Sequence, residues 1–368
     1  MIKIYDMETL EEREILFRGG SGADVSAPVA EILRAVQERG DAALREYTLR
    51  FDGAAPDALA VTAEEVDQAA AQVEPAFLAV LEEAAEHIRA YHARQKRESF
   101  VMTEREGVVL GQRIIPLARV GIYVPGGTAA YPSTVLMNAI PARIAGVGEI
   151  IMVTPPGRDG AVNPHILAAA KIAGVTRIYK VGGAQAVAAL AYGTGTIPQV
   201  DKIVGPGNAY VAEAKRQVFG RVNIDMIAGP SEVLVLADGR SNPAWVAADL
   251  LSQAEHDRMA AAVLVTDSRP LAEAVAHELE RQLAALPRAE IARASLEANG
   301  KLIVCRDLRE GIAVANRIAP EHLELCVDNP FDYLGEIQNA GSVFLGRSSD
   351  ENIVEAISRI KEALSKLV

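Results

Sequence analysis

From Leu117 onward, short apolar segments alternate with stretches rich in small residues, and this alternation restricts the fold more than any other feature of the chain. The first apolar segments are ARVGIYVP, EIIMVTPP, RIYKVGG and KIVGPGN, and helix-like segments such as STVLMNAIPARIAG lie between them. Strands that are apolar throughout and separated by helices belong to parallel sheets that are covered on both faces. The sequence therefore predicts an α/β protein.

A second series of the same kind follows the first. Its apolar segments are EVLVLAD, AAAVLVT, KLIVC, HLELCV and SVFLG, again with helical stretches between them. Two consecutive series indicate two doubly wound Rossmann-like units, over residues 111–229 and 230–346, and they raise the possibility of a duplication. The repeat lies in the pattern and not in sequence identity. No low-complexity linker divides the units, so we expect them to pack closely.

Helical patterns occupy both ends of the chain. Residues 1–110 are predicted to form an N-terminal helical region, in which Val29, Ile32, Leu33 and Val36 share one stripe and Thr62 and Glu65 have capping-box spacing. Residues 347–368 read as a short C-terminal amphipathic helix. Its apolar stripe requires burial against its own domain or a second subunit. The positions of that stripe are Ile353, Ile357, Ile360, Leu364 and Leu367.

Bulk composition excludes several classes of protein. With 368 residues and a net charge of −12, the chain would be repelled by nucleic acid and by anionic membranes. The N-terminus has charges where a signal peptide needs an apolar run, and no apolar stretch approaches the roughly 20 residues of a membrane span. Cys305 and Cys326 lie in apolar runs and read as buried thiols rather than as a disulfide. These features predict a cytoplasmic protein.

Three glycine-rich loops follow strands of the first predicted sheet, at Tyr123–Gly127, Gly182–Gln185 and Gly205–Asn208. Ligands of a doubly wound sheet bind outside the carboxyl ends of its strands, where glycine lets backbone amides approach a phosphate. None of these loops matches G-x-G-x-x-G. Tight strand-to-helix turns need glycine too, so a nucleotide site and plain turns remain alternatives.

Polar groups in the second predicted unit suggest metal binding. Gln253 and His256 lie three apart near a helix end, so an amide oxygen and an imidazole nitrogen could share one cation. Two ligands do not complete a zinc site, however, and His256 would also be favourable at the C-terminal end of a helix dipole. Ser231, in the segment AGPSE, reads as turn chemistry or as a ligand contact.

Glu321 and His322 form an adjacent carboxylate and imidazole just before the predicted strand LELCV. Histidine titrates near neutrality and glutamate can activate water, so the pair suits general acid–base catalysis. Residues that precede a strand border the edge of the sheet away from the usual ligand crevice, which speaks against this interpretation. Glu-His is also a common dipeptide.

Taken together, the motifs are far more specific than any of them alone. In order and spacing they resemble the L-histidinol dehydrogenase family, over a stretch from about residue 25 to residue 346. The segments that carry the resemblance are VGIYVPGG, STVLMNAIPARIAG, VGGAQAVAALAYGT, VDKIVGPGNAYVAEAKRQV, AGPSEVLVLAD, DLLSQAEHD, RIAPEHLEL and NAGSVFLG.

The resemblance implies an activity and its cofactors. Enzymes of this family oxidise L-histidinol to L-histidine by two successive hydride transfers to NAD, through a bound aldehyde, while a zinc ion holds the substrate. By similarity, Tyr123, Gln185 and Asn208 would contact NAD, and Ser231 would contact the substrate. The family is also homodimeric, which implies a second copy of this chain as partner.

The resemblance assigns the remaining residues as well. Gln253 and His256 would be two of four zinc ligands. His322 would contact the substrate and act as the base that removes its protons, while Glu321 would activate the water that hydrates the aldehyde. These roles are consistent with the residue types: a metal would orient the carbinol, and a nearby base would accept its proton.

After Gly346 the sequence no longer matches the family's motifs. The family continues with a motif resembling G-D-Y-A-x-G-x-N-H, whose aspartate binds zinc, and later with E-G-L-x-x-H, which supplies a substrate contact and the fourth zinc ligand. The segment RSSDENIVEAISRIKEALSKLV contains neither, and Asp350 reads as a helix cap. We therefore expect weak or absent zinc binding, impaired turnover and a weakened homodimer.

Two other functions stay open at this point. One is a catalytically silent nucleotide-binding or assembly scaffold, which loss of the C-terminal ligands would favour. The other is a dehydrogenase of the same family that acts on a different alcohol. The retained pairs Glu321–His322 and Gln253–His256 favour the histidinol-type dehydrogenase over both.

Overall fold

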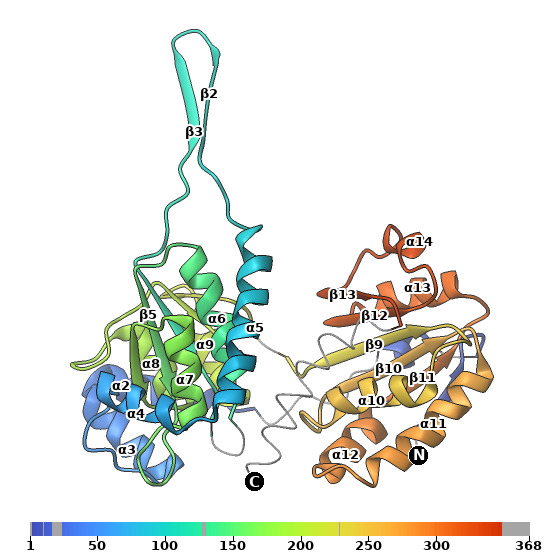
Figure 1. Cartoon of the computed structure of the whole chain (residues 1–368), viewed down its shortest axis with the longest axis horizontal. Coiled ribbons are helices and arrows are strands. Elements are labelled where there is room, and N and C mark those ends of the chain that lie inside the picture. Colours follow the sequence, from blue (N-terminus) through green and yellow to red (C-terminus); the bar gives the residue numbers. More distant parts are fainter. Residues whose placement is uncertain (1, 10, 17–23, 127–129, 228, 348–368) are drawn as a thin grey trace. The chain divides into compact units, whose positions relative to one another are not determined.

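The computed structural model describes residues 2–9, 11–16, 24–126, 130–227 and 229–347. The chain forms two compact units, of which one holds residues 22–228 and the other begins at Gly229 and includes the N-terminal segment (Figure 1). The predicted C-terminal helix lies outside the described residues. The predicted class, two doubly wound Rossmann-like units with an N-terminal helical region, is confirmed.

The sheet of residues 22–228 has the strand order β6-β5-β4-β7-β8, and all its described pairings are parallel. The chain starts in the middle at β4, moves outward to β6, and crosses back to β7. Strand order therefore reverses between β4 and β7, as in dinucleotide-binding folds. The strands are β4 (Arg119–Tyr123), β5 (Glu149–Thr154), β6 (Arg177–Lys180), β7 (Lys202–Val204) and β8 (Asn223–Ile224).

Helices cover both faces of this sheet, and the alternation along β5 shows why. Ile151 and Val153 join one buried cluster, whereas Ile150 and Met152 join the other. The first cluster contains α2 (Ser26–Arg39), α3 (Asp41–Asp52), α8 (Gly183–Tyr192) and α9 (Ala209–Val218). The second contains α4 (Ala63–Gln72), α5 (Pro75–Ala93), α6 (Pro132–Ile144) and α7 (Pro164–Ala173).

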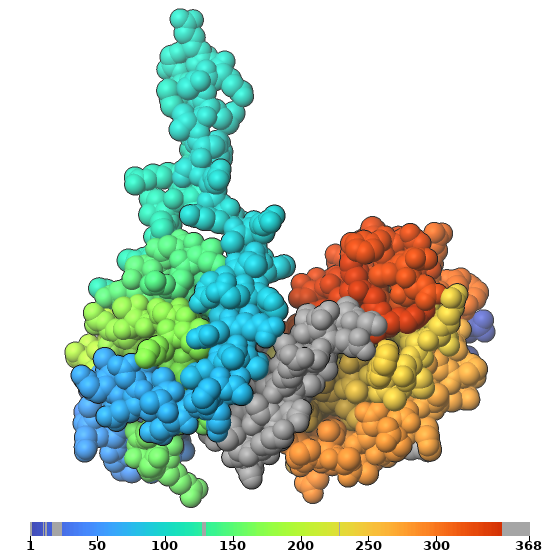
Figure 2. All heavy atoms as spheres, viewed as in Figure 1, coloured from blue at the N-terminus to red at the C-terminus, as the bar shows by residue number. Residues whose placement is uncertain are grey.

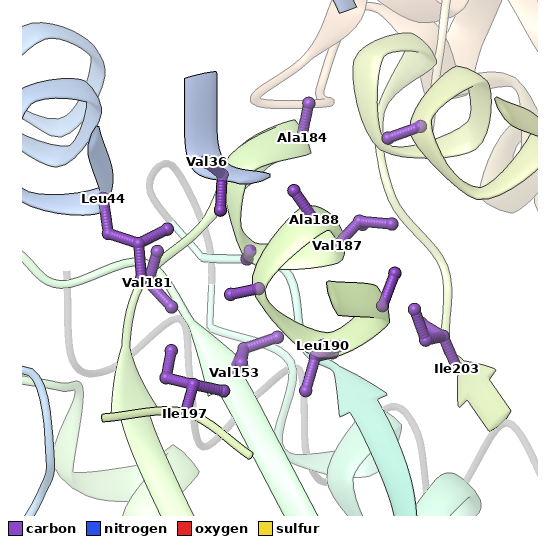
Figure 3. Packing of buried hydrophobic residues seen from close by; sticks show 14 of the residues in the cluster. Val36, Leu44, Val153, Val181, Ala184, Val187, Ala188, Leu190, Ile197 and Ile203 are labelled. Atoms are coloured by element: carbon purple, nitrogen blue, oxygen red, sulfur yellow. The ribbon is translucent and has the colours of Figure 1, made fainter. Parts of the chain in front are cut away.

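Small side chains let α8 pack closely on the sheet. Ala184, Ala188 and their neighbours bring the helix toward Val153 and Val181, as Figure 3 shows. A Cβ atom at Gly121 of β4 would stand 2.8 Å from a methyl carbon of Leu190. The strand and the helix are therefore too close for any side chain at this position.

The N-terminal helices belong to the same unit as this sheet. The predicted stripe Val29–Val36 on α2 is buried, and the predicted capping box is present: Glu65 N donates to Thr62 Oγ1 at 3.1 Å, and Thr62 N donates to Glu65 Oε2 at 2.8 Å. Both predictions are confirmed. The segment before them takes a different course, because β1 (Ile4–Asp6) and α1 (Glu12–Leu16) join the other unit.

A hairpin projects from the unit of residues 22–228. Its strands, β2 (Phe100–Arg105) and β3 (Val108–Gln112), pair antiparallel, and all of their residues are exposed (Figures 1 and 2). Isolated two-stranded hairpins are marginally stable in water. The expected boundary at residue 110 falls inside β3, and the boundaries predicted from the sequence stay predictions.

The second sheet has the order β1-β11-β10-β9-β12-β13, again with parallel pairings among the described strands. From β9 to β13 this repeats the order of the first sheet, and β1 is added at the edge beside β11. The two sheets thus share one topology. The strands are β9 (Glu232–Ala237), β10 (Ala261–Thr266), β11 (Lys301–Val304), β12 (His322–Cys326) and β13 (Ser342–Leu345).

Helices cover both faces of the second sheet too. One buried cluster contains residues of α10 (Pro243–Ala254), α11 (Arg269–Leu283) and α12 (Ala289–Asn299), and the other contains residues of α1 and α13 (Leu308–Ile318), with α14 (Phe331–Leu334) beside it. Both cysteines are free and buried, as predicted. None of the described helices is both long and apolar enough to cross a membrane.

A buried lysine joins three elements of the first sheet. Lys215 on α9 is only 1% exposed; its Nζ donates to the carbonyl of Gly205 at 2.9 Å and forms an ion pair with Asp225. Asp225 in turn accepts from Gly205 N at 2.8 Å. The network fixes the loop after β7 to α9 and to the residue that follows β8.

We expect Lys215→Ala to lower the free energy of unfolding by about 2–5 kcal/mol, because it leaves a cavity where the buried side chain packs and breaks its contacts with Gly205 and Asp225. Chemical denaturation measures this change. Arg216→Ala is the matched control: Arg216 pairs with Glu213 on the exposed side of the same helix, so its loss should cost only about 0–1 kcal/mol. Equal effects of the two substitutions would contradict the importance of the buried network.

Candidate functional site

The three residues expected to contact NAD lie at one edge of the first sheet. Tyr123 ends β4, Gln185 lies in the first turn of α8, and Asn208 caps α9. All three follow the carboxyl ends of parallel strands, at or beside the point between β4 and β7 where strand order reverses. This is the region where doubly wound folds bind ligands.

The Tyr123 side chain reaches from β4 to the start of α8. Its hydroxyl accepts a hydrogen bond from Gly183 N at 3.0 Å, and the ring is buried. Burial, partly offset by that hydrogen bond, raises the pKa of Tyr123 to about 12. The hydroxyl therefore keeps its proton at neutral pH and can donate it to a ligand.

Gln185 is the most unusual polar residue of the unit. Its side chain is 1% exposed, yet neither amide atom has a hydrogen-bond partner among the described residues. Buried polar atoms are nearly always paired, and leaving them unpaired costs free energy. An amide held in this state is prepared to bind a group that supplies both a donor and an acceptor.

Two glycines allow the backbone to close around these side chains. Gly183 has φ +64°, and a Cβ there would stand 2.6 Å from Gln185 Oε1. Gly205 has φ +112°, and a Cβ there would stand 2.2 Å from the carbonyl oxygen of Tyr123. Only glycine fits either position. The glycine pattern in the sequence thus reflects close packing around Tyr123 and Gln185.

Asn208 is exposed and has a structural role as well as the predicted one. Its Oδ1 accepts from Tyr210 N and Val211 N, both at 3.1 Å, and so caps α9. The side-chain oxygen is therefore engaged. The amide nitrogen is the atom that can reach a ligand.

The residues of the second unit that are expected to contact the substrate or to act in acid–base catalysis lie at the amino edge of their own sheet. Ser231 precedes β9, Glu321 precedes β12, and His322 begins β12 opposite Val233. The backbone N of Glu232 approaches Glu321 Oε2 at 3.4 Å, and Ser231 accepts at its carbonyl from Ala261 N at 3.1 Å. Neighbouring strands thus bring Ser231, Glu321 and His322 to one edge.

Gln253 and His256 lie in the connection from α10 to β10, which leads to the same edge. Gln253 is half-buried in the last turn of α10, and His256 is exposed just after it, with its backbone N donating to the Gln253 carbonyl at 3.1 Å. Among the described residues, no group of three or more His, Cys, Asp and Glu side chains could hold a metal ion. These two residues do not by themselves satisfy the coordination of zinc.

An arginine lies at the carboxyl edge of the second sheet. Arg347 donates to Ser241 Oγ at 2.9 Å and to the Cys326 carbonyl at 2.8 Å, and it forms ion pairs with Asp238 and Asp328. The guanidinium lies where β9 and β12 end, the position at which strand order reverses in this sheet. Beside Arg347 the edge stays open, as a pocket whose lining includes Asp238, Asp267 and Asp328.

Comparisons with known proteins identify the family. The sequence model described as histidinol dehydrogenase matches residues 18–359. The histidinol dehydrogenase of Geobacter metallireducens is 56% identical over 347 residues, which span 93% of this chain and 79% of that protein. The histidinol dehydrogenase of Listeria monocytogenes serotype 4b is 53% identical and covers 94% of this chain and 80% of its own length.

This chain belongs to the histidinol dehydrogenase family. A solved structure of histidinol dehydrogenase from Elizabethkingia anophelis agrees, with a TM-score of 0.90 at 40% identity over 94% of this chain and 80% of that one. The family match extends beyond both limits, 25 and 346, expected from the motifs. Family members are NAD-dependent dehydrogenases, so the chain is an enzyme by class.

The glycine at position 205 offers a test of the close packing at Tyr123. We expect Gly205→Ala to destabilise the protein by about 3 kcal/mol or more, because a methyl group adds a clash with the Tyr123 carbonyl to the strain of positive φ. Gly220→Ala isolates the strain: Gly220 has φ +94° but no atom within 4 Å of a built Cβ, so about 1–2 kcal/mol is expected. Thermal and denaturant unfolding of the two variants would measure the difference, and equal losses would contradict the packing argument.

Proposed function

We propose that this chain oxidises L-histidinol to L-histidine with NAD, in two steps through the aldehyde. The observation that carries the proposal is membership of the histidinol dehydrogenase family over nearly the whole chain, with Glu321 and His322 side by side at one sheet edge. Each step removes a hydride from the carbinol carbon and a proton from its oxygen. NAD accepts the hydride, and a base of the protein accepts the proton.

His322 is the proposed base. Its imidazole is half-buried at the start of β12 and packs near the ring of Phe344, with centroids 5.9 Å apart. An imidazole changes charge near neutral pH, so it can take the carbinol proton and release it again. Glu321 is exposed beside it and can take a proton from the water that adds to the aldehyde. Ser231, on the neighbouring strand, would contact the substrate.

The dinucleotide would bind at the carboxyl edge of the first sheet, against Tyr123, Gln185 and Asn208. The buried Tyr123 hydroxyl, the unpaired amide of Gln185 and the amide nitrogen of Asn208 offer hydrogen-bonding groups there.

Zinc is a proposed cofactor with Gln253 and His256 as two of its ligands. The ion, when bound, would hold the amino and imidazole groups of the substrate. Since the described donors do not complete a zinc site, we derive no catalytic step through the metal. The expectation of weak zinc binding stays a prediction.

A homodimer and a cytoplasmic location complete the proposal. The fully exposed hairpin β2–β3 carries Val101 at 70% and Val109 at 71% exposure, and apolar surface of this kind favours association. Light scattering that shows a monomer at micromolar concentration would contradict the dimer. Two free, buried thiols suit a reducing compartment.

Replacing the proposed base tests the chemistry. His322→Gln should lower kcat for NADH formation from L-histidinol by about 10²–10⁴-fold, because glutamine cannot take the proton. Glu321→Gln should slow the hydration step and allow the aldehyde to accumulate. His277→Gln, an exposed histidine on α11, is the control and should leave kcat unchanged. Full activity of His322→Gln would reject the assignment of the base.

Two substitutions at Asn208 separate its roles. Asn208→Ala should weaken NAD binding and also destabilise α9 by about 1 kcal/mol through loss of the cap. Asn208→Ser keeps an oxygen that can cap the helix but lacks the amide nitrogen. We expect Asn208→Ser to retain stability and still bind NAD roughly fivefold more weakly in calorimetry, as loss of one hydrogen bond predicts. Unchanged affinity in Asn208→Ser would show that Asn208 acts only as a cap.

A further inference from the structure

Asp52, which no sequence motif singles out, occupies a position that disfavours a carboxylate. It is the last residue of α3, where the negative end of the helix dipole repels an anion. It is half-buried, and its Oδ2 is buried without a hydrogen-bond partner among the described residues. Burial raises the pKa of Asp52 to about 6, so the group is mainly ionised at neutral pH. One oxygen of an ionised carboxylate is thus buried without a hydrogen-bond partner among the described residues.

Asp52 lies beside the proposed dinucleotide site. α3 packs on α8 within the cluster that holds Tyr123, and Asp41 at the start of α3 accepts from Thr196 Oγ1 beyond the end of α8, so Asp52 at the other end of α3 lies toward the start of α8. Consistent with this, burial raises the pKa of the Tyr123 hydroxyl, and the charge of Asp52 adds to that effect. That hydroxyl contacts Gly183 N, and Gln185 has its unpaired amide in the same turn. Three polar groups therefore converge, and two of them have no partner.

The location of Asp52 is close to the place where dinucleotide-binding sheets usually contact a ribose. In dinucleotide-binding sheets of this strand order, the acidic residue that binds a ribose follows the second strand. Here the second strand, β5, ends in Thr154 and continues with Pro155 and Pro156, and the first acid after it, Asp159, is exposed and accepts from Ala161 N within its own loop. A Cβ built at Gly182 would stand 2.6 Å from Pro155 Cβ, so the end of β5 adjoins the start of α8. The Tyr123 hydroxyl contacts this same start of α8.

We propose that Asp52 is a specificity-determining residue: its carboxylate accepts a hydrogen bond from a ribose hydroxyl of NAD and repels the phosphate that NADP carries on that ribose. The inference rests on the proposed binding of NAD to the first sheet. It explains why a partnerless anion is retained at a helix C-terminus. The residue contributes nothing favourable until the ligand arrives.

The test combines affinity with stability at pH 8, on the full chain. Calorimetry should show NAD binding about tenfold weaker in Asp52→Ala, since the hydrogen bond lost is to a charged group. Asp52→Asn should also weaken NAD binding but should bind NADP at least as well as the parent, so the preference for NAD over NADP falls. Asp57→Asn, an exposed acid five residues away, is the control and should change neither.

Stability distinguishes this role from a merely structural one. Without ligand, Asp52→Asn should unfold at the same or a higher temperature than the parent, because it removes a half-buried negative charge from the C-terminal end of a helix. Unchanged affinities in both Asp52 variants of a parent that binds NAD would overturn the inference. A lowered unfolding temperature together with weaker NAD binding would overturn it as well. A parent that binds no NAD would instead reject the proposed function.

Discussion

The contact between β4 and the loop after β7 sets the geometry of the proposed dinucleotide site. Gly205 lies against the carbonyl of Tyr123 so closely that no side chain fits, and the Lys215–Asp225 pair holds Gly205 in place through its own N–H and carbonyl. Tyr123 is thereby fixed at the point where strand order reverses, with its hydroxyl on the start of α8. The pair joins a buried lysine to an exposed aspartate, and its contacts with both backbone groups of Gly205 fix one arrangement of this sheet edge.

Sequence patterns predicted much of this architecture because they report local requirements. The apolar runs identified the parallel strands, and the glycine loops marked the edge at which Tyr123 and Gln185 meet. Pairing between distant strands has no local sequence pattern. For example, β1 joins the second sheet by pairing Ile4 with Leu302, nearly three hundred residues away. Lys215 lies in the segment AKRQV, which reads as a solvated helix face, and its burial depends on Asp225 beyond the next strand.

The two sheets share one strand order but offer different edges for function. In the first, the carboxyl edge has glycine turns and unpaired polar groups. In the second, Arg347 joins the ends of β9 and β12, while Ser231, Glu321 and His322 lie at the amino edge. From the sequence alone, this amino-edge location speaks against a catalytic role for Glu321 and His322. At the carboxyl edge, Arg347 pairs with Asp238 and Asp328, and the pocket beside it remains accessible.

Unpaired polar groups locate function more sharply than the motifs do. Glycine loops are compatible with plain turns, and Asn208 would be retained as a helix cap alone. Gln185 has no comparable structural reason, since a buried amide without partners lowers stability. An apolar residue of similar size would satisfy packing at lower cost, so a group that binds the amide accounts for its presence. The same reasoning applies to Asp52, which is charged. Burying a charge without a hydrogen-bond partner costs more free energy than burying an amide, so a ligand that donates a hydrogen bond would stabilise Asp52 more.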